Sequence, residues 1–81
     1  MIVRLKMFAI LRDRSGVSEM NLELSEGATV AAAVAEVGRR FSPVTDILAR
    51  CASAVNQEYV KPGTLLHSGD ELALIPPVSG G

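Results

Sequence analysis

Aromatic side chains are scarce in this sequence, which has no tryptophan, one tyrosine and two phenylalanines. Hydrophobic residues still make up 48% of its 81 residues, which excludes an intrinsically disordered chain. Valine, leucine, isoleucine and alanine must therefore build the core. Because a domain this short buries only about 60% of its unfolded surface, we expect a single domain with one modest core.

Residues that bind metals are equally few, since the chain has one cysteine and one histidine. Cys51 alone can form neither an internal disulfide nor a thiolate zinc site. His67 lies in a predicted turn and has no second ligand near it in the sequence. We interpret Cys51 as a small buried side chain, and the sequence predicts no metal site.

Neither sign of charge predominates: eight basic and nine acidic residues are scattered along the chain and give a net charge of −1. Without a basic stripe to neutralise phosphates, nucleic acid is not an expected partner. The longest apolar stretches are too short to span a bilayer, and residues 1–6 alternate like a strand instead of resembling a signal peptide. These features predict a soluble cytoplasmic protein with no membrane partner.

Alternating and helical patterns divide the chain into elements. Residues 2–11 alternate as one strand and residues 18–24 as a second, which predicts a hairpin across the turn at residues 13–16. Thr29 is a favourable N-cap for a helix whose apolar residues recur at helical spacing up to Phe41. Ser42 and Pro43 begin a second short helix that ends near Arg50.

The second half of the chain predicts shorter strands. Residues 52–56 and 59–60 flank a turn and form a small hairpin, and residues 71–75 form the last strand. In that strand we expect Leu72 and Leu74 to face the core, with Glu71, Ala73 and Ile75 on the other face.

The last six residues differ from the rest: they are Pro76, Pro77, Val78, Ser79, Gly80 and Gly81. Two prolines fix φ and lack an N–H donor, so the preceding strand cannot continue. We therefore divide the chain into a domain at residues 1–75 and an extended tail at 76–81. The tail ends in two flexible glycines, and the carboxyl carbon of Gly81 is unhindered because glycine has no Cβ.

The Gly81 carboxyl group is the candidate reactive group. A free α-carboxylate has a pKa of about 3.5, so at neutral pH it is ionised and a poor electrophile. It must be activated, for example as an acyl adenylate, yet the sequence has no glycine-rich phosphate-binding loop. We expect the activation, and the ATP it uses, to belong to a partner enzyme. This chain would be no enzyme on its own and would bind no cofactor.

Residues 54–60 and 69–81, together with Phe8, Ala9, Arg12 and Gly16, resemble the small subunit of molybdopterin synthase, a family of ubiquitin-like sulfur carriers. Gln57 stands where many relatives carry glycine, which affects the turn type. The resemblance implies an α+β fold of the β-grasp type. In that fold a mixed sheet has its first and last strands as parallel neighbours at the centre, beside one main helix.

The resemblance also implies a reaction cycle. A ubiquitin-activating-like enzyme adenylates Gly81, and a sulfur donor protein converts the adenylate to a thiocarboxylate. The tail then enters the synthase large subunit, where its sulfur attacks a cyclic pterin precursor. The family implies a heterotetramer of two small and two large subunits.

Outward-facing residues of the two central strands predict a docking surface. We expect an apolar patch formed by Phe8 and Ile75, joined by Tyr59, on a face that is otherwise charged. The other reading is that a short helix or loop covers these side chains.

Three other functions fit parts of the sequence. A protein modifier would use the same Gly81 adenylate to form an isopeptide bond to a lysine. A thiamine-pathway sulfur carrier shares the Gly-Gly ending but usually lacks the Pro-Pro-Val step found at residues 76–78. A plain β-grasp binding module would lose nothing when Gly80 and Gly81 are removed.

Overall fold

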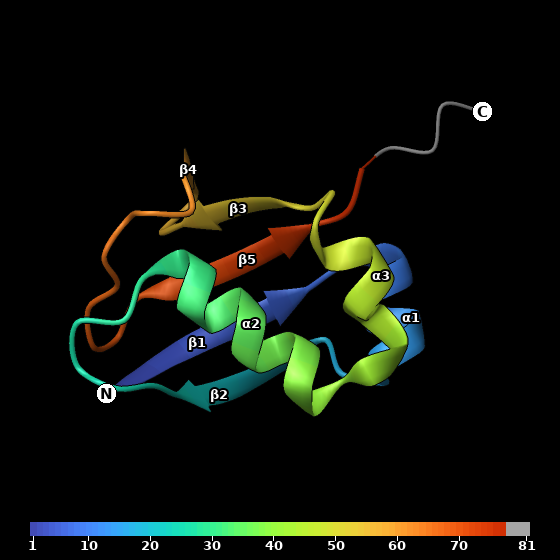
Figure 1. Cartoon of the computed structure of the whole chain (residues 1–81), viewed down its shortest axis with the longest axis horizontal. Helices are drawn as coiled ribbons and strands as arrows, with labels where there is room; N and C mark the ends of the chain where they lie inside the picture. The colour runs from blue at the N-terminus through green and yellow to red at the C-terminus, as the bar shows by residue number, and fades with distance from the viewer. Residues whose placement is uncertain (78–81) are drawn as a thin grey trace.

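A computed structural model describes residues 1–77 of the chain (Figure 1). Its elements, in chain order, are β1 (Ile2–Met7), α1 (Ala9–Ser15), β2 (Glu19–Glu23), α2 (Val30–Arg40), the 3₁₀ turn η1 (Ser42–Val44), α3 (Thr45–Leu48), β3 (Ala52–Val55), β4 (Glu58–Val60) and β5 (Glu71–Ile75).

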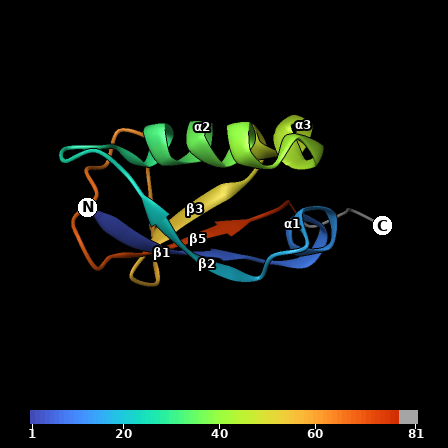
Figure 2. The same ribbon diagram turned by 90° about the horizontal axis from the view of Figure 1, so that it is seen from below.

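These strands form one mixed sheet in the order β2-β1-β5-β3-β4. β1 and β5 are parallel neighbours near the centre, and all other neighbouring strands are antiparallel. α2 lies across one face of the sheet, with α3 in the same layer (Figure 2). The predicted β-grasp architecture is therefore confirmed.

The core lies between the sheet and α2. Inward side chains of β1 and β5, which include Leu5 and Leu72, are fully buried, as are Ala33 and Val37 on α2. The alternation in residues 2–7 and 71–75 predicted these faces correctly. Burying such side chains contributes roughly 1.5–3 kcal/mol each, so the two central strands and α2 supply much of the stability.

α2 begins where the sequence predicts. The Thr29 hydroxyl oxygen accepts a hydrogen bond from the Ala32 N–H at 3.2 Å, which satisfies one donor of the first turn. Gly38, an unusual residue within a helix, also has a packing reason. A Cβ at Gly38 would lie 3.3 Å from Cδ1 of Leu48, so glycine lets α3 pack closely against α2.

The prediction of one strand over residues 2–11 is wrong beyond Met7. The chain turns at Ala9, whose φ is +50°, and forms α1. Leu11 on this helix is fully buried, so tertiary packing outweighs the alternating pattern. Gly16 ends the helix at φ +78°, with its N–H donating to the Arg12 carbonyl at 2.8 Å. β1 and β2 are therefore joined through a helix instead of a tight turn.

The second predicted helix is shorter than expected and is divided into η1 and α3. Pro43 lies in the first turn of η1, as its restricted φ favours. Beyond Leu48 the backbone continues with bonds of the 3₁₀ type, from Arg50 N–H to Ile47 O and from Cys51 N–H to Leu48 O.

The predicted hairpin of β3 and β4 is confirmed. Its two turn residues, Asn56 and Gln57, have φ values of +50° and +71°, which fits the twist of a two-residue hairpin. β5 ends at Ile75, directly before Pro76, as the two prolines predict.

Candidate functional site

The face of the sheet opposite α2 is the candidate site, and we call it the open face (Figure 2). Strand pairing determines which residues share this face, because partners in register point the same way. Its members are Glu19, Asn21 and Glu23 of β2, Ile2, Arg4 and Lys6 of β1, Glu71, Ala73 and Ile75 of β5, Ala52 and Ala54 of β3, and Tyr59 of β4.

One half of the open face is charged. Lys6 Nζ lies 3.0 Å from a carboxylate oxygen of Glu71, and Arg4 Nε lies 3.6 Å from one of Glu19. The four side chains are between 30% and 47% exposed and remain in contact with solvent, so each ion pair contributes only modestly to stability. These charged residues form a polar border beside the remaining, apolar part of the open face.

The other half is apolar, and we define the apolar half as Phe8, Ala52, Ala54, Tyr59, Ala73 and Ile75. Ala54 is only 5% exposed although it lies outside the hydrophobic core. Its register partners are Tyr59 on β4 and Ala73 on β5, so small side chains form a shallow floor beside a large aromatic ring. Such a surface suits a complementary apolar side chain from another protein.

The structure places the three predicted docking residues on the same face of the sheet, with Phe8 beside Ile75 and Tyr59 on the edge strand β4. Phe8 follows Met7, which pairs with Leu74, so Phe8 lies level with Ile75. Its backbone is extended at φ −124° and ψ 159°, which turns its ring away from buried Met7 and onto the open face. Phe8 is 44% exposed and Tyr59 is 73% exposed. Both side chains therefore remain accessible to solvent, Tyr59 more than Phe8.

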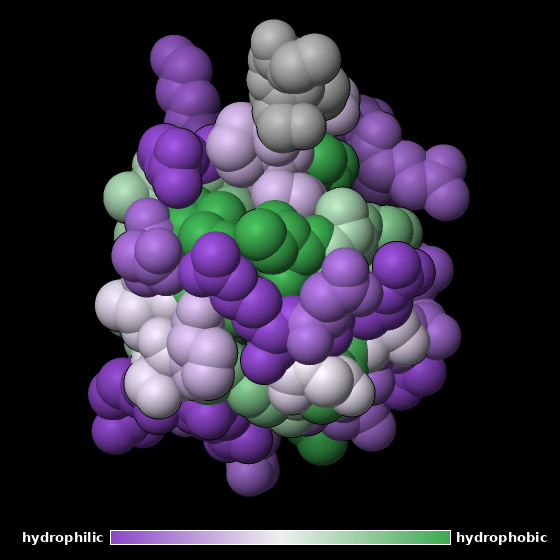
Figure 3. Space-filling model, turned by 90° about the vertical axis from the view of Figure 1, so that its right-hand side faces the viewer, coloured by the Kyte–Doolittle hydropathy of each residue, from purple (hydrophilic) through white to green (hydrophobic). Residues whose placement is uncertain are grey.

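Sequence reasoning missed one exposed apolar residue near this surface. Ile10, expected in the first strand, lies on α1 and is 40% exposed. Figure 3 views the end of the molecule that carries α1 and α3, and it shows a band of hydrophobic surface bordered by hydrophilic residues. Ile10 follows Phe8 by two residues and adds an exposed apolar side chain next to it.

The predicted tail begins at the edge of this surface. Pro76 and Pro77 follow β5 without strand pairing, and Pro77 is exposed. The other predicted tail residues, Val78, Ser79, Gly80 and Gly81, lie outside the described residues.

Cys51, interpreted from the sequence as a buried side chain, is only partly buried. The Cys51 thiol donates to the Ile47 carbonyl at 3.4 Å, and burial raises the pKa of this thiol, which disfavours the nucleophilic thiolate. Among residues 1–77, no group of three or more histidine, cysteine, aspartate or glutamate side chains is placed to hold a metal ion. Across the same range, no helix has the length and hydrophobicity needed to cross a membrane.

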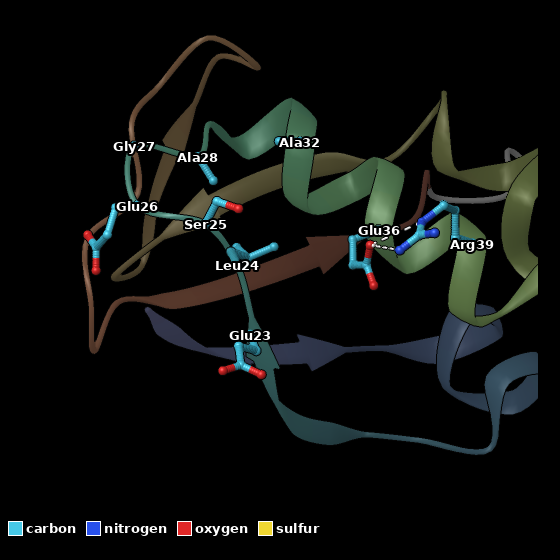
Figure 4. A pocket seen from close by; sticks show the side chains of 9 residues that line it. All are labelled: Glu23, Leu24, Ser25, Glu26, Gly27, Ala28, Ala32, Glu36 and Arg39. Carbon is cyan, nitrogen blue, oxygen red and sulfur yellow. Dashed lines mark hydrogen bonds and ion pairs between the residues drawn. The ribbon is translucent and has the colours of Figure 1, made fainter.

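A shallow groove of about 500 Å³ lies between α2, the end of β2 and the loop after it, at the opposite edge of the sheet from Tyr59 (Figure 4). Two of its charged groups, Glu36 and Arg39, bind each other, and Arg40 beside the groove also binds Glu36. Glu36 accepts from Nε of Arg40 at 2.8 Å and from Nε of Arg39 at 3.1 Å. These bonds, that of Arg40 first, lower the pKa of Glu36. The groove therefore offers a polar surface without a concentrated reactive group.

A family profile and a full-length relative both match this chain. The sequence profile of the ThiS family matches residues 5–81. The molybdopterin synthase sulfur carrier subunit of Chlamydomonas reinhardtii is 37% identical over 83 aligned residues, which cover 100% of both chains.

Solved structures share the whole fold. SAMP1 from Haloferax volcanii matches with a TM-score of 0.89 at 27% identity, over 100% of both chains. A chain from the complex of subunits 1 and 2 of molybdopterin-converting factor from Helicobacter pylori matches with a TM-score of 0.70 over 100% of both chains. Its identity is 23%, so this likeness shows the fold alone.

Proposed function

This chain belongs to the ThiS family, and from that premise we propose that it carries sulfur for molybdopterin synthesis on the C-terminal carboxyl group of Gly81. The full-length similarity to a molybdopterin synthase sulfur carrier subunit supports this function. The observation that carries the proposal is the position of the apolar half, directly beside the end of β5. A partner that docks there receives the chain that follows Pro77.

The proposed cycle begins with activation by a ubiquitin-activating-like enzyme. The Gly81 carboxylate attacks the α-phosphorus of ATP, which forms an acyl adenylate and releases pyrophosphate. A sulfur donor protein then supplies sulfur at the oxidation level of sulfide, which displaces AMP and leaves a thiocarboxylate. ATP is thus a substrate of the partner enzyme, and this chain holds no cofactor.

Sulfur transfer takes place in the large subunit of molybdopterin synthase. There the thiocarboxylate sulfur attacks an oxygen-bearing carbon of the cyclic pterin precursor, and the carbon–oxygen bond breaks as the oxygen leaves as water or phosphate. Water then hydrolyses the resulting thioester, which leaves the sulfur on the precursor and restores the Gly81 carboxylate. Two such transfers supply the two sulfur atoms of the dithiolene. Because the sulfur is tethered to a docked protein, it reaches the precursor at high effective concentration.

Catalytic groups come from the large subunit in this proposal. The present chain is its small subunit, in a heterotetramer of two small and two large subunits, and is inactive alone. The apolar half, with Phe8, Tyr59 and Ile75, contacts the activating enzyme and the large subunit in turn. One surface serves both partners because both must receive the same tail.

Intact-mass spectrometry tests the first half of the cycle. The purified chain is incubated with its activating enzyme, ATP and sulfide, and we expect the mass increase of one oxygen replaced by sulfur. Fragmentation should place this change on Gly81. A chain lacking Gly81 serves as the control, and a wild-type chain whose mass stays unchanged would contradict the proposed chemistry.

Protein modification is the second candidate. The similarity to SAMP1, small archaeal modifier protein 1, favours it. The same adenylate would then react with a lysine amine, forming an isopeptide bond and releasing AMP. Proteomic analysis of cell extract would detect Gly81 linked to lysine side chains. Such conjugates would add a modifier role, whereas their absence alongside Gly81 thiocarboxylate would leave sulfur transfer as the function.

A further inference from the structure

The turn between β3 and β4 is tied to the start of β5 by side-chain hydrogen bonds. Asn56 Nδ2 donates to Oδ1 of Asp70 at 3.0 Å, and Asn56 Oδ1 accepts from the Glu71 N–H at 3.0 Å. The Asn56 N–H also donates to the Glu71 carbonyl at 2.9 Å. One asparagine thus makes three bonds to two consecutive residues.

Asp70 is fixed from its other side. Its Oδ2 accepts from the His67 N–H at 2.8 Å, and its backbone carbonyl accepts from the Arg4 N–H at 2.8 Å. The Asp70 side chain is only 14% exposed. Asp70 therefore joins the hairpin turn to the start of β5 through its carboxylate and is bound to β1 through its backbone carbonyl, and we call Asn56 and Asp70 the turn clamp.

β4 depends on this attachment because it is a short edge strand. It contains three residues, Glu58–Val60, and within residues 1–77 its only neighbouring strand is β3. Beyond it, the Pro62 and Thr64 carbonyls accept from N–H groups at the start of α2, each at 2.9 Å. β4 is thus held at one end by α2 and at the other by the turn clamp.

The turn itself is under backbone strain. Asn56 tolerates a left-handed conformation, but Gln57 at φ +71° lacks the freedom of glycine. A strained turn on a short edge strand would relax if its attachment were lost. Tyr59, two residues further on, would then change its position on the open face.

We propose that Asn56 and Asp70 are positioning residues for docking: by clamping the β3–β4 turn to β5, they hold the Tyr59 ring beside Ala54 and Ala73 in the arrangement that the large subunit recognises. This inference rests on the proposed function, since it concerns the same surface and partner. It adds Asn56 and Asp70 to the residues that determine docking. Both act by positioning Tyr59 and do not contact the large subunit themselves.

The test is a double-mutant cycle on binding to the molybdopterin synthase large subunit of the same organism. N56G removes the amide and keeps a turn that accepts positive φ, so the fold is retained. We expect N56G and Y59A each to weaken binding about tenfold, measured by calorimetry on the full chain. In the Y59A background, N56G should change the affinity less than about twofold, because the ring it positions is gone.

D70N is the second variant. Asparagine has one acceptor oxygen, so it cannot bind both Asn56 and the His67 N–H. It should repeat the loss of affinity and the coupling to Y59A. D46N is the matched control, since Asp46 lies on α3 and, within residues 1–77, its carboxylate accepts from Arg14 alone, at 3.3 Å. D46N should bind as wild type does.

Hydrogen exchange measures the clamp without any partner. We expect the amides of residues 58–60 to exchange faster in N56G and D70N, and at the wild-type rate in D46N. Unchanged exchange would overturn the clamp. If exchange is faster but the losses of affinity in N56G and Y59A simply add in the double variant, the clamp exists but does not act by positioning Tyr59. If the wild-type chain fails to bind the large subunit at all, the proposed function fails, and the docking role of the clamp fails with it.

Discussion

At the scale of single residues, Phe8 is the most informative side chain of the apolar half. It is 44% exposed and lies outside the hydrophobic core, so its burial contributes little to folding. We predict that F8D abolishes binding to the large subunit, because a carboxylate would be desolvated in an apolar contact. Its urea denaturation midpoint should match that of the wild type.

The matched control for F8D is L65D. Leu65 is also a large exposed apolar residue, at 56%, but it lies in the loop between β4 and β5 and pairs with Thr29 at the start of α2. L65D should bind normally in the same calorimetric titration. Normal binding by F8D, or equal losses in both variants, would contradict the docking surface.

Gln57 is the second residue at which stability can be predicted. Its φ of +71° is a conformation that glycine adopts readily and other residues adopt at a cost. Q57G should therefore raise the free energy of unfolding by about 1 kcal/mol, as measured by urea denaturation. A variant less stable than the wild type would show that the Gln57 side chain makes contacts that outweigh the strain.

At the scale of elements, the cap of α2 gives a clear prediction. The Thr29 hydroxyl accepts from the Ala32 N–H, and T29A leaves that donor without its side-chain partner. We expect T29A to lower the free energy of unfolding by about 1 kcal/mol, whereas T29S, which keeps the hydroxyl, should stay close to wild type. Equal stability of T29A and T29S would argue against the cap.

Elements with a strong periodic pattern were predictable, and α1 was not. The apolar spacing of residues 30–41 and the alternation of residues 2–7 and 71–75 are direct consequences of one-sided burial. Ala9 and Leu11 continue that alternation by chance. The positive φ of Ala9 and the burial of Leu11 depend on packing against other elements, which local sequence does not encode.

The position of the candidate docking residues was predictable to a similar degree. Phe8, Tyr59 and Ile75 were expected on the outer face because apolar residues at outward positions of a strand are conspicuous, and whether they bind a partner stays a prediction. The turn clamp was missed, because Asn56 and Asp70 are 14 residues apart and both types are common in turns. The parallel pairing of β1 and β5 came from the family resemblance, since residue patterns do not specify which strands are neighbours.

At the scale of the whole molecule, acid stability should depend on Asp70. Hydrogen bonds from the His67 N–H and then from the Asn56 side chain lower the pKa of this carboxyl below its ordinary value of 3.8. A lowered pKa means that the folded state favours the charged form. The resulting stability is present above the unfolded pKa and is lost as the pH falls through the folded value.

The measurement is urea denaturation of the wild type and D70N at neutral pH and below pH 4. The wild type should be the more stable protein at neutral pH, and the difference should shrink in acid as Asp70 becomes protonated. A difference that does not change with pH would show that the carboxylate charge is not what stabilises the turn.

The most direct test of the account is reconstitution of the transfer itself. The chain is prepared with a C-terminal thiocarboxylate on Gly81 and mixed with the large subunit and the cyclic pterin precursor, and molybdopterin is measured. A chain lacking Gly81 is the control. We predict product from the first mixture and none from the control. No product, with the thiocarboxylate left intact, would contradict sulfur transfer to the pterin as the function of this chain.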